Sequence, residues 1–234
     1  MIGFIERENE ILRLIKEFFD RGLDFIVVGG YAVSGLARHR FSVDLDIIIR
    51  KEDVEKFERI LGERGFEKNL ERAGFDEVYG GEFVNYIKKI NDLPVTVDLL
   101  VGSLVCRNTN ASWSFDYVKR YSVITNIAGI EMSASARVPE KELLIAFKIH
   151  SGRKADVRDV VVLIEDADIG RIAKHLKRGD LNLLKAQINT IIEMLKDVRL
   201  VDSLKGVFAI RSDVSKQIEI ARKKLEKIKD LTVS

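Results

Sequence analysis

Two aspartates stand one residue apart in an apolar segment of this 234-residue chain. The segment reads "SVDLDIIIR", and in it Asp44 and Asp46 flank Leu45. Because successive side chains of a strand point to opposite faces, the two carboxylates share one face while Leu45 points to the core. Two carboxylates held this close repel each other, and a bound divalent cation removes the conflict. The spacing therefore predicts a metal site on a strand.

A third acid, Asp98, stands in another apolar stretch, "PVTVDLLV". If the two strands are neighbours, Asp98 lies beside the first pair. Three such acids can hold two metal ions, one that activates an attacking hydroxyl and one that steadies leaving phosphates. We expect Mg²⁺, which prefers carboxylate and phosphate oxygens, with Mn²⁺ as the substitute. The structural alternative is a salt-bridged or exposed acid pair at a strand edge, which the three isoleucines after Asp46 disfavour.

Gly29 and Gly30 end the apolar run "LDFIVVGG" and precede a helical pattern. Glycine lets a phosphate approach the backbone closely, and the start of a helix offers free N–H groups. A purely structural turn is the alternative. The chain has no G-x-G-x-x-G element here, and "GYAVSGLA" lacks the Gly-Lys of a P-loop. A Rossmann cofactor site and a P-loop site are therefore disfavoured.

The apolar periodicity of the first part of the chain alternates between helix and strand. It predicts helices over residues 6–21, 31–38 and 51–66, and strands over 23–28, 42–50, 82–90 and 93–102, with a turn at Asn91–Asp92. Residues 108–136 indicate short strands and loops. We expect an α/β (α+β) domain over residues 1–138, with a mixed sheet flanked by helices.

The pattern becomes almost entirely helical after Pro139. It predicts helices over residues 140–150, 154–165, 168–177, 180–200 and 213–230. We therefore expect a second, all-helical domain over residues 139–234. From Arg171 onward, 15 basic residues stand against 8 acidic ones, a net charge of +7. This is either an ordinary solvated face or a surface that receives a polyanion such as RNA.

Composition narrows the class of protein. The formal net charge is only +2, so the overall charge of the chain does not indicate a nucleic-acid partner. Three scattered histidines and one cysteine do not make a zinc site, and Cys106 alone excludes an intrachain disulfide. No run of 18 apolar residues exists, and the N-terminus is too charged for a signal peptide. We expect a cytoplasmic protein with no membrane partner.

The succession of a strand, Gly-Gly, a short helix, Arg-x-Ser and Asp-x-Asp resembles the nucleotidyltransferase superfamily, whose fold is shared with DNA polymerase beta. The residues that carry the resemblance are Gly29, Gly30, Arg40, Ser42, Asp44 and Asp46, with Asp98 as the later acid. The segment "VVGGYAVSGLARHRFSVDLDIII" is similar to the corresponding sequences of the branch that contains the AbiEii-type toxins. The resemblance covers the chain up to about residue 100.

This resemblance implies an Mg²⁺-dependent enzyme that moves a nucleoside monophosphate from an NTP to an acceptor hydroxyl. Asp44, Asp46 and Asp98 would be catalytic and hold the metal, and Gly29, Gly30, Arg40 and Ser42 would bind the nucleotide. The toxin branch implies tRNA as acceptor and an antitoxin as partner. A small-molecule acceptor, and a non-catalytic nucleotide-binding or regulatory module, are the alternatives. The oligomeric state stays open.

A second resemblance lies beyond Pro139, where "FKIHSGRKADVRDVVVL" is similar to a helical motif of the same branch. Its matching residues are Lys148, Arg153, Asp156 and Asp159. The resemblance implies that Lys148 touches the triphosphate, that Arg153 binds the nucleotide, and that Asp156 supports the site. The structural alternatives are a lysine whose stem covers the core and an ion-pair ladder at helical spacing.

Overall fold

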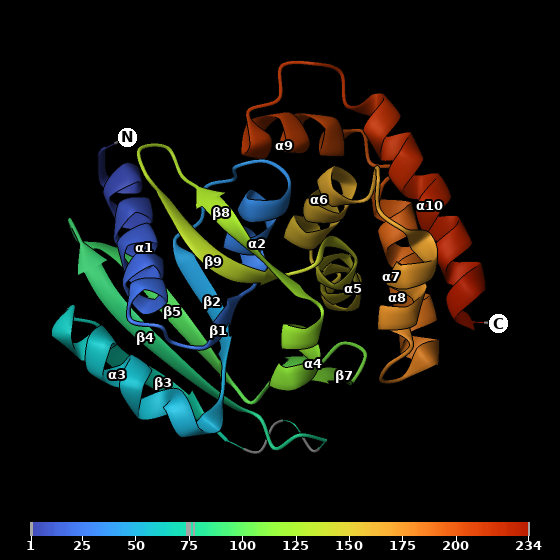
Figure 1. Ribbon diagram of the computed structural model, residues 1–234. Coiled ribbons are helices and arrows are strands. Elements are labelled where there is room, and N and C mark those ends of the chain that lie inside the picture. The colour runs from blue at the N-terminus through green and yellow to red at the C-terminus, as the bar shows by residue number, and fades with distance from the viewer. Residues whose placement is uncertain (1, 74–75, 77, 234) are drawn as a thin grey trace. The chain divides into compact units, whose positions relative to one another are not determined.

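The computed structural model describes residues 2–73, 76 and 78–233, and its first part mixes strands and helices (Figure 1). The elements are α1 (Ile2–Asp20), β1 (Phe25–Val27), α2 (Gly29–Leu36), β2 (Asp44–Ile49), η1 (Lys51–Asp53), α3 (Val54–Glu63), β3 (Glu67–Arg72), β4 (Glu82–Ile90), β5 (Leu93–Val101), β6 (Ser103–Cys106), β7 (Ala111–Ser114), α4 (Phe115–Arg120), β8 (Ser122–Ala128) and β9 (Ser133–Pro139).

A five-stranded mixed sheet in the order β1-β2-β5-β4-β3 forms the centre of this part. Strand β2 pairs with β5 in parallel, and the other pairs are antiparallel. The β4–β5 hairpin turns at Asn91 and Asp92, whose φ angles of 51° and 60° are those of a two-residue turn that matches the strand twist. The predicted mixed sheet and the predicted turn are both confirmed.

Alternation along the central strands separates a core face from a polar face. Leu45 and Ile47 of β2 and Val97 and Leu99 of β5 are fully buried. Three phenylalanines from α1, β1 and α3 pack edge to face, with Phe18 at 5.6 Å from Phe25 and at 4.9 Å from Phe57 between ring centroids. Burial of these side chains anchors α1 and α3 to the sheet and holds β2 and β5 in place.

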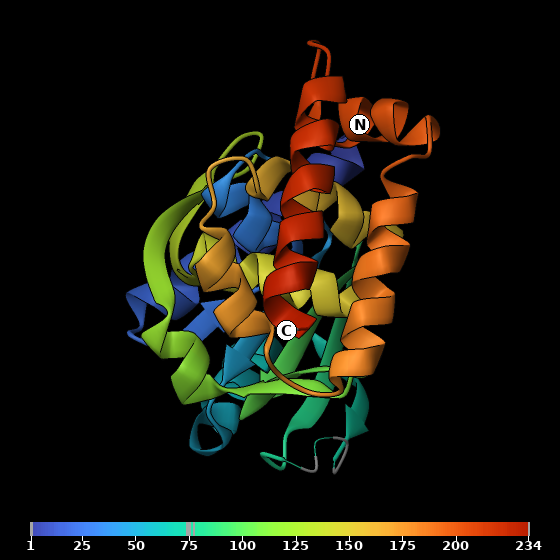
Figure 2. The same cartoon turned by 90° about the vertical axis from the view of Figure 1, so that its right-hand side faces the viewer.

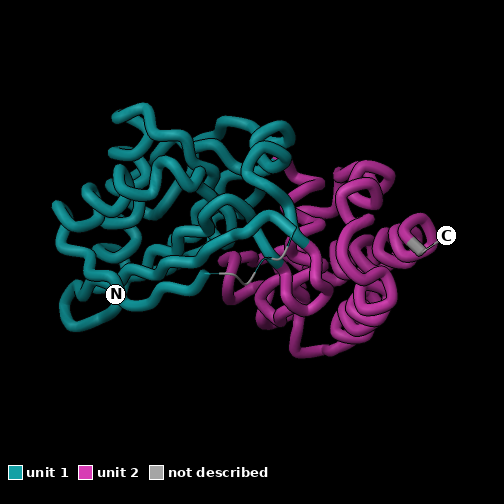
Figure 3. The backbone as a smooth tube through the Cα atoms, turned by 90° about the horizontal axis from the view of Figure 1, so that it is seen from below, with its two compact units in different colours: residues 1–105, 112–139 teal, residues 106–111, 140–234 magenta. Residues whose placement is uncertain are grey.

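The chain divides into two compact units, residues 1–105 with 112–139 and residues 106–111 with 140–234 (Figure 3). The helices of the second unit are α5 (Lys141–Ser151), α6 (Lys154–Leu163), α7 (Ile169–Leu176), α8 (Leu181–Met194), α9 (Arg199–Phe208) and α10 (Ser215–Val233). Helix α10 packs along α7 and α8 (Figure 2). The predicted division into a domain of residues 1–138 and a domain of residues 139–234 stays a prediction.

The structure also differs from the sequence-based prediction in three elements. Strand β3 was not predicted, because all of its side chains are exposed and it lacks an apolar alternation. Helix α4 lies where short strands and loops were expected. The predicted helix 180–200 is two helices, because the chain leaves the helix after Met194 and α9 begins only at Arg199, whose backbone N–H donates to Asp197 at 3.0 Å. None of the helices in the described part of the chain is long and apolar enough to cross a membrane.

Candidate active site

Strand pairing brings the three predicted acids onto one polar face of the first unit. In the parallel ladder Asp46 stands directly beside Asp98, and Asp44 stands beside Thr96. Leu45 between the two β2 acids is fully buried, whereas Asp44 is exposed and Asp46 is half-buried. The acids therefore do not lie in the apolar core. They lie on the solvent-facing side of strands whose other side is the core.

Two neighbours that sequence reasoning missed hold these carboxylates. Thr96 Oγ1 donates a hydrogen bond of 2.7 Å to Asp44 Oδ1, and Asn85 Nδ2 donates one of 2.6 Å to Asp98 Oδ1. Asn85 stands opposite Asp98 in the β4–β5 ladder, and its own Oδ1 accepts from Asn69 Nδ2 at 2.8 Å. Alternation within "PVTVDLLV" places Thr96 on the face of Asp98, which was a usable signal.

Burial raises the pKa of the Asp98 carboxyl, and the negative charge of Asp44 raises it further. The hydrogen bond from Asn85 opposes both effects, because it stabilises the ionised form. A cation bound at this face would relieve the mutual repulsion of the two acids.

The glycine pair is required by the packing of the protein itself. Gly29 begins α2 with φ +66°, and a Cβ there would overlap the carboxylate of Asp46. A Cβ at Gly30 would lie 2.8 Å from Arg40 Nη2 and 3.2 Å from Ser42 Oγ. The pair therefore lets the start of α2 lie against Asp46, Arg40 and Ser42. The start of a helix with no side chains in the way suits an anionic group.

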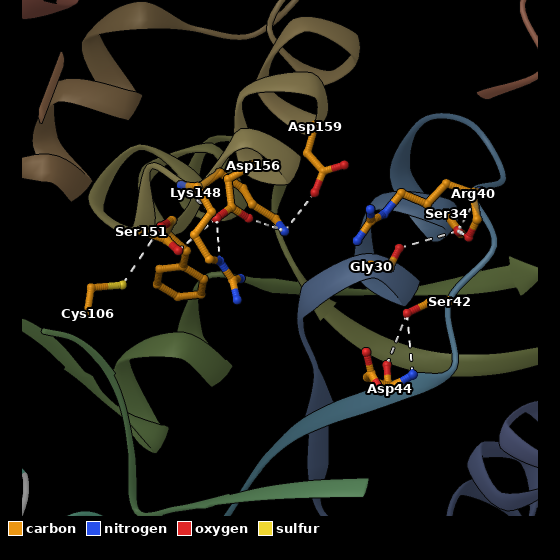
Figure 4. A network of polar contacts seen from close by, with 12 residues as sticks. Gly30, Ser34, Arg40, Ser42, Asp44, Cys106, Lys148, Ser151, Asp156 and Asp159 are labelled. Atoms are coloured by element: carbon orange, nitrogen blue, oxygen red, sulfur yellow. Dashed lines mark hydrogen bonds and ion pairs between the residues drawn. The ribbon is translucent and has the colours of Figure 1, made fainter. Parts of the chain in front are cut away.

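The loop between α2 and β2 carries Arg40 and Ser42 (Figure 4). Ser34 fixes its start, because Ser34 Oγ accepts the Arg40 backbone N–H at 3.1 Å. Tyr31 fixes its end by donating a hydrogen bond of 2.7 Å to the Ser42 carbonyl. Both anchors come from α2, so the loop returns over the glycine turn. All seven residues that the N-terminal resemblance names thus lie in one region of the first unit.

The donor chemistry of this region suits a hard divalent ion, since it consists of carboxylate oxygens. In the described residues, no group of three or more His, Cys, Asp or Glu side chains is arranged to hold a metal ion. Asp44 and Asp98 are instead directed toward Thr96 and Asn85. The pairing of β2 with β5 sets the carboxylates on one face, as a metal site requires. A bound ion would have to turn the Asp44 and Asp98 carboxylates toward itself.

A second polar cluster lies in the other unit, between α5 and α6 (Figure 4). Lys148 is 4% exposed, and its Nζ lies 2.9 Å from Asp156 Oδ1 and 2.7 Å from Asp159 Oδ2. Asp156 Oδ2 also accepts from Ser151 Oγ at 2.7 Å and from Arg153 Nε at 2.8 Å. The four residues of the second resemblance therefore form one cluster, in which Lys148, Asp156 and Asp159 are buried.

Opposite charges dominate this cluster. Burial raises the pKa of Asp156, but the positive charge of Lys148 and the hydrogen bonds from Arg153 and Lys148 bring it to about 2. Burial lowers the pKa of Lys148, and the charges of Asp159 and Asp156 outweigh that effect and raise it. Lys148 is therefore charged and paired within its own unit. Arg153, with its side chain 72% exposed, is the residue of the cluster that reaches solvent.

Comparison with known proteins gives structural likenesses only. No family model matches the sequence, and no curated protein matches it. A proposed nucleotidyltransferase from H. pylori is similar with a TM-score of 0.47 and 17% identity, covering 98% of this chain and 96% of that one. JHP933 from Helicobacter pylori has a TM-score of 0.48 and 16% identity, covering 97% of this chain and 93% of that one.

A third solved structure, ANT(2'')-Ia in complex with adenylyl-2''-tobramycin, has a TM-score of 0.39 and 16% identity. It covers 86% of this chain and 95% of that chain. These likenesses are too distant to show a function, so a function has to be argued from the geometry of the site.

Proposed function

We propose that this chain is a metal-dependent nucleotidyltransferase that moves a nucleoside monophosphate from an NTP to an acceptor hydroxyl. The observation that supports this most directly is the parallel register that sets Asp46 beside Asp98, with Asp44 on the same face. A glycine turn at the start of a helix lies against the same carboxylates. Carboxylates for cations and a bare helix start for phosphates are the two parts that phosphoryl transfer needs.

Each residue has a role in the proposed reaction. Asp44 and Asp46 would hold Mg²⁺, which would neutralise phosphate charge. The backbone at Gly29–Gly30, with Arg40 and Ser42, would orient the triphosphate. The acceptor oxygen forms a bond to the α-phosphorus, the bond from that phosphorus to the bridging oxygen breaks, and pyrophosphate leaves. Ionised Asp98 would take the acceptor's proton.

The direct test supplies each α-labelled NTP with Mg²⁺ and a panel of acceptors. The panel contains tRNA, small hydroxyl compounds such as an aminoglycoside, and the protein alone. We expect label on one acceptor, with pyrophosphate released in equal amount, and loss of both in Asp46→Asn. Asp20→Asn is the matched control, because Asp20 pairs with Lys16 on the exposed side of α1. Turnover that survives Asp46→Asn would contradict the assignment.

Two outcomes distinguish the alternatives. NTP binding in calorimetry, without pyrophosphate release over long incubation, would identify a nucleotide-binding or regulatory module. Label on a small molecule and none on RNA would identify a small-molecule nucleotidyltransferase. The basic surplus after Arg171 favours an RNA acceptor, because phosphate contacts come mainly from Lys and Arg.

A toxin role with an antitoxin partner is the finer form of the proposal, and it is supported by the resemblance of residues 27–49 alone. Expression should then arrest growth, and Asp46→Asn should relieve the arrest while the protein accumulates to the same level. Normal growth during expression of the intact chain would exclude this role.

A further inference from the structure

A separate cavity of about 250 Å³ lies in the helical unit, among α6, α8 and α9. Val157 of α6, Met194 of α8 and Leu200 of α9 give it an apolar surface, and Val157 and Leu200 are 1% and 9% exposed. The space between the helices of a bundle is a common location for small-molecule sites. The cavity uses none of the residues assigned to the nucleotidyltransferase reaction.

The remaining lining is strongly cationic. Lys154, Arg158 and Arg199 all border the cavity, against the single acid Asp197. Arg199 holds that acid, with Nε 3.0 Å from Asp197 Oδ1 and Nη2 2.8 Å from Oδ2. Lys154 and Arg158 make no ion pair within 4 Å in the part of the chain that the structure describes, although the charge of Lys154 acts on Asp197. Three basic side chains border the cavity against one acid, so its lining carries a net positive charge.

Arg158 provides the second observation. Its Nη1 donates a hydrogen bond of 2.7 Å to Ser203 Oγ, which holds the guanidinium at the cavity. Arg158 as a whole is only half-buried and borders the cavity. A guanidinium held in place at a cavity is a good partner for a carboxylate or phosphate.

We propose that this cavity binds a small organic anion, with its carboxylate or phosphate head on Arg158 and Lys154 and its apolar body against Val157, Met194 and Leu200. The apolar surface excludes a bare inorganic ion as the preferred ligand, because such an ion would leave that surface without contacts. The charges exclude a neutral apolar molecule as the preferred ligand, because it would displace water from the basic side chains without replacing their hydrogen bonds.

Calorimetry on the full chain with four probes tests this. Phenyl phosphate and benzoate carry both parts of the expected ligand, inorganic phosphate carries only the head, and phenol carries only the body. We expect at least one aromatic anion to bind about tenfold or more tightly than phenol and inorganic phosphate, with affinity falling as salt rises. The better of the two identifies the head group. Equal binding of phenol, or no binding of either aromatic anion, would overturn the inference.

Variants locate the probe. Arg158→Met should weaken the aromatic anion about tenfold or more, and Met194→Trp should block it by filling the cavity while keeping every charge. Lys185→Met, at an exposed lysine of α8, is the matched control and should change nothing. Near-ultraviolet circular dichroism checks that each variant is folded. Binding that survives both Arg158→Met and Met194→Trp but is lost in Arg40→Met would place the probe in the other unit, and the inference would fail while the proposed function stands.

Discussion

At the scale of single residues, the candidate site depends on small contacts around each carboxylate. Asp98 receives a hydrogen bond from Asn85, and Asp46 has space only because residue 29 is glycine. Through these contacts, the charge or the position of an acid depends on a neighbouring side chain or backbone that does not itself react. Substitution of those neighbours therefore tests the site without removing the acids.

Asn85→Ala removes the hydrogen bond that stabilises ionised Asp98, so the pKa of Asp98 should rise further above its usual value. If ionised Asp98 takes the acceptor's proton, the acidic limb of the pH–activity profile should move to higher pH. Titration of the Asp98 carboxyl carbon by NMR checks the shift without any substrate. Asn69→Ala, which removes only the donor to Asn85, should shift the limb less. An unchanged Asp98 titration in Asn85→Ala would contradict this reading.

Gly29→Ala should destabilise the chain more than Gly22→Ala does. Both glycines have similar φ angles, +66° and +69°, so the backbone cost of about 1–2 kcal/mol is common to both. Only at position 29 does the new Cβ overlap a side chain, that of Asp46, which should add about 1 kcal/mol or more. Urea unfolding measures the difference. In an Asp46→Ala background the excess should disappear, and its persistence there would mean that Asp46 is not the cause.

At the scale of elements, the α5–α6 pair is held together by charge inside an apolar setting. Lys148 of α5 is paired with two acids of α6, and all three side chains are at most 5% exposed. A buried pair is weak support for stability by itself, but loss of one partner leaves an uncompensated charge. The cluster therefore makes the junction of these helices sensitive to single substitutions and to acid.

Lys148→Met should cost about 3–5 kcal/mol of unfolding free energy, because Asp156 and Asp159 would stay buried without their cation. Lys141→Met is the matched control on the same helix. Its partner Asp166 is 74% exposed, so the loss should be below about 1 kcal/mol. Chemical denaturation of both variants measures the two losses. Equal losses would contradict the role given to burial.

Acid should weaken the same junction. The pKa of Asp156 falls from 3.8 to about 2 on folding, so its contribution is complete above pH 3.8 and is lost as the pH falls toward 2. The expected loss is about 2 kcal/mol. Asp156→Asn should be less stable at neutral pH and should show a shallower decline in this window. A decline as steep as that of the parent chain would exclude Asp156 as its source.

At the scale of the whole molecule, the chain consists of two compact units with different chemistry. The first contains the acidic face and the glycine turn, and the second contains the Lys148 cluster and the cationic cavity. The chain's single tryptophan, Trp113, is fully buried and belongs to the first unit. Its fluorescence therefore reports the unfolding of the unit in which the proposed nucleotide site lies.

Mg²⁺ with a non-hydrolysable NTP should stabilise the Trp113 unfolding transition. A ligand at a hundred times its dissociation constant adds about 2.7 kcal/mol to the folded state that binds it. Thermal unfolding followed by fluorescence measures the shift, and Asp46→Asn should abolish it. Far-ultraviolet circular dichroism, followed in parallel, shows whether the helical unit responds as well. A Trp113 transition that Mg·NTP does not move would argue against a nucleotide site in the first unit.

The sequence by itself determined the local features of this protein. The two-residue period of a strand puts Asp44 and Asp46 on one face, and Gly29 and the Asn91–Asp92 turn take the positive φ angles that these residue types tolerate best. The helical periods after Pro139 likewise predicted most of the helices found there. These features depend on neighbours a few residues away, so the sequence suffices for them.

Only the tertiary structure decided which distant residues meet. The parallel register of β2 with β5 sets Asp46 beside Asp98, and the next ladder brings Asn85 to the same carboxylate. It also decided that Lys148 is enclosed by Asp156 and Asp159, where an exposed ladder at helical spacing was equally compatible with the sequence. The reason is physical: pairing register and burial are set by the packing of apolar faces far apart in the chain, which no local pattern encodes.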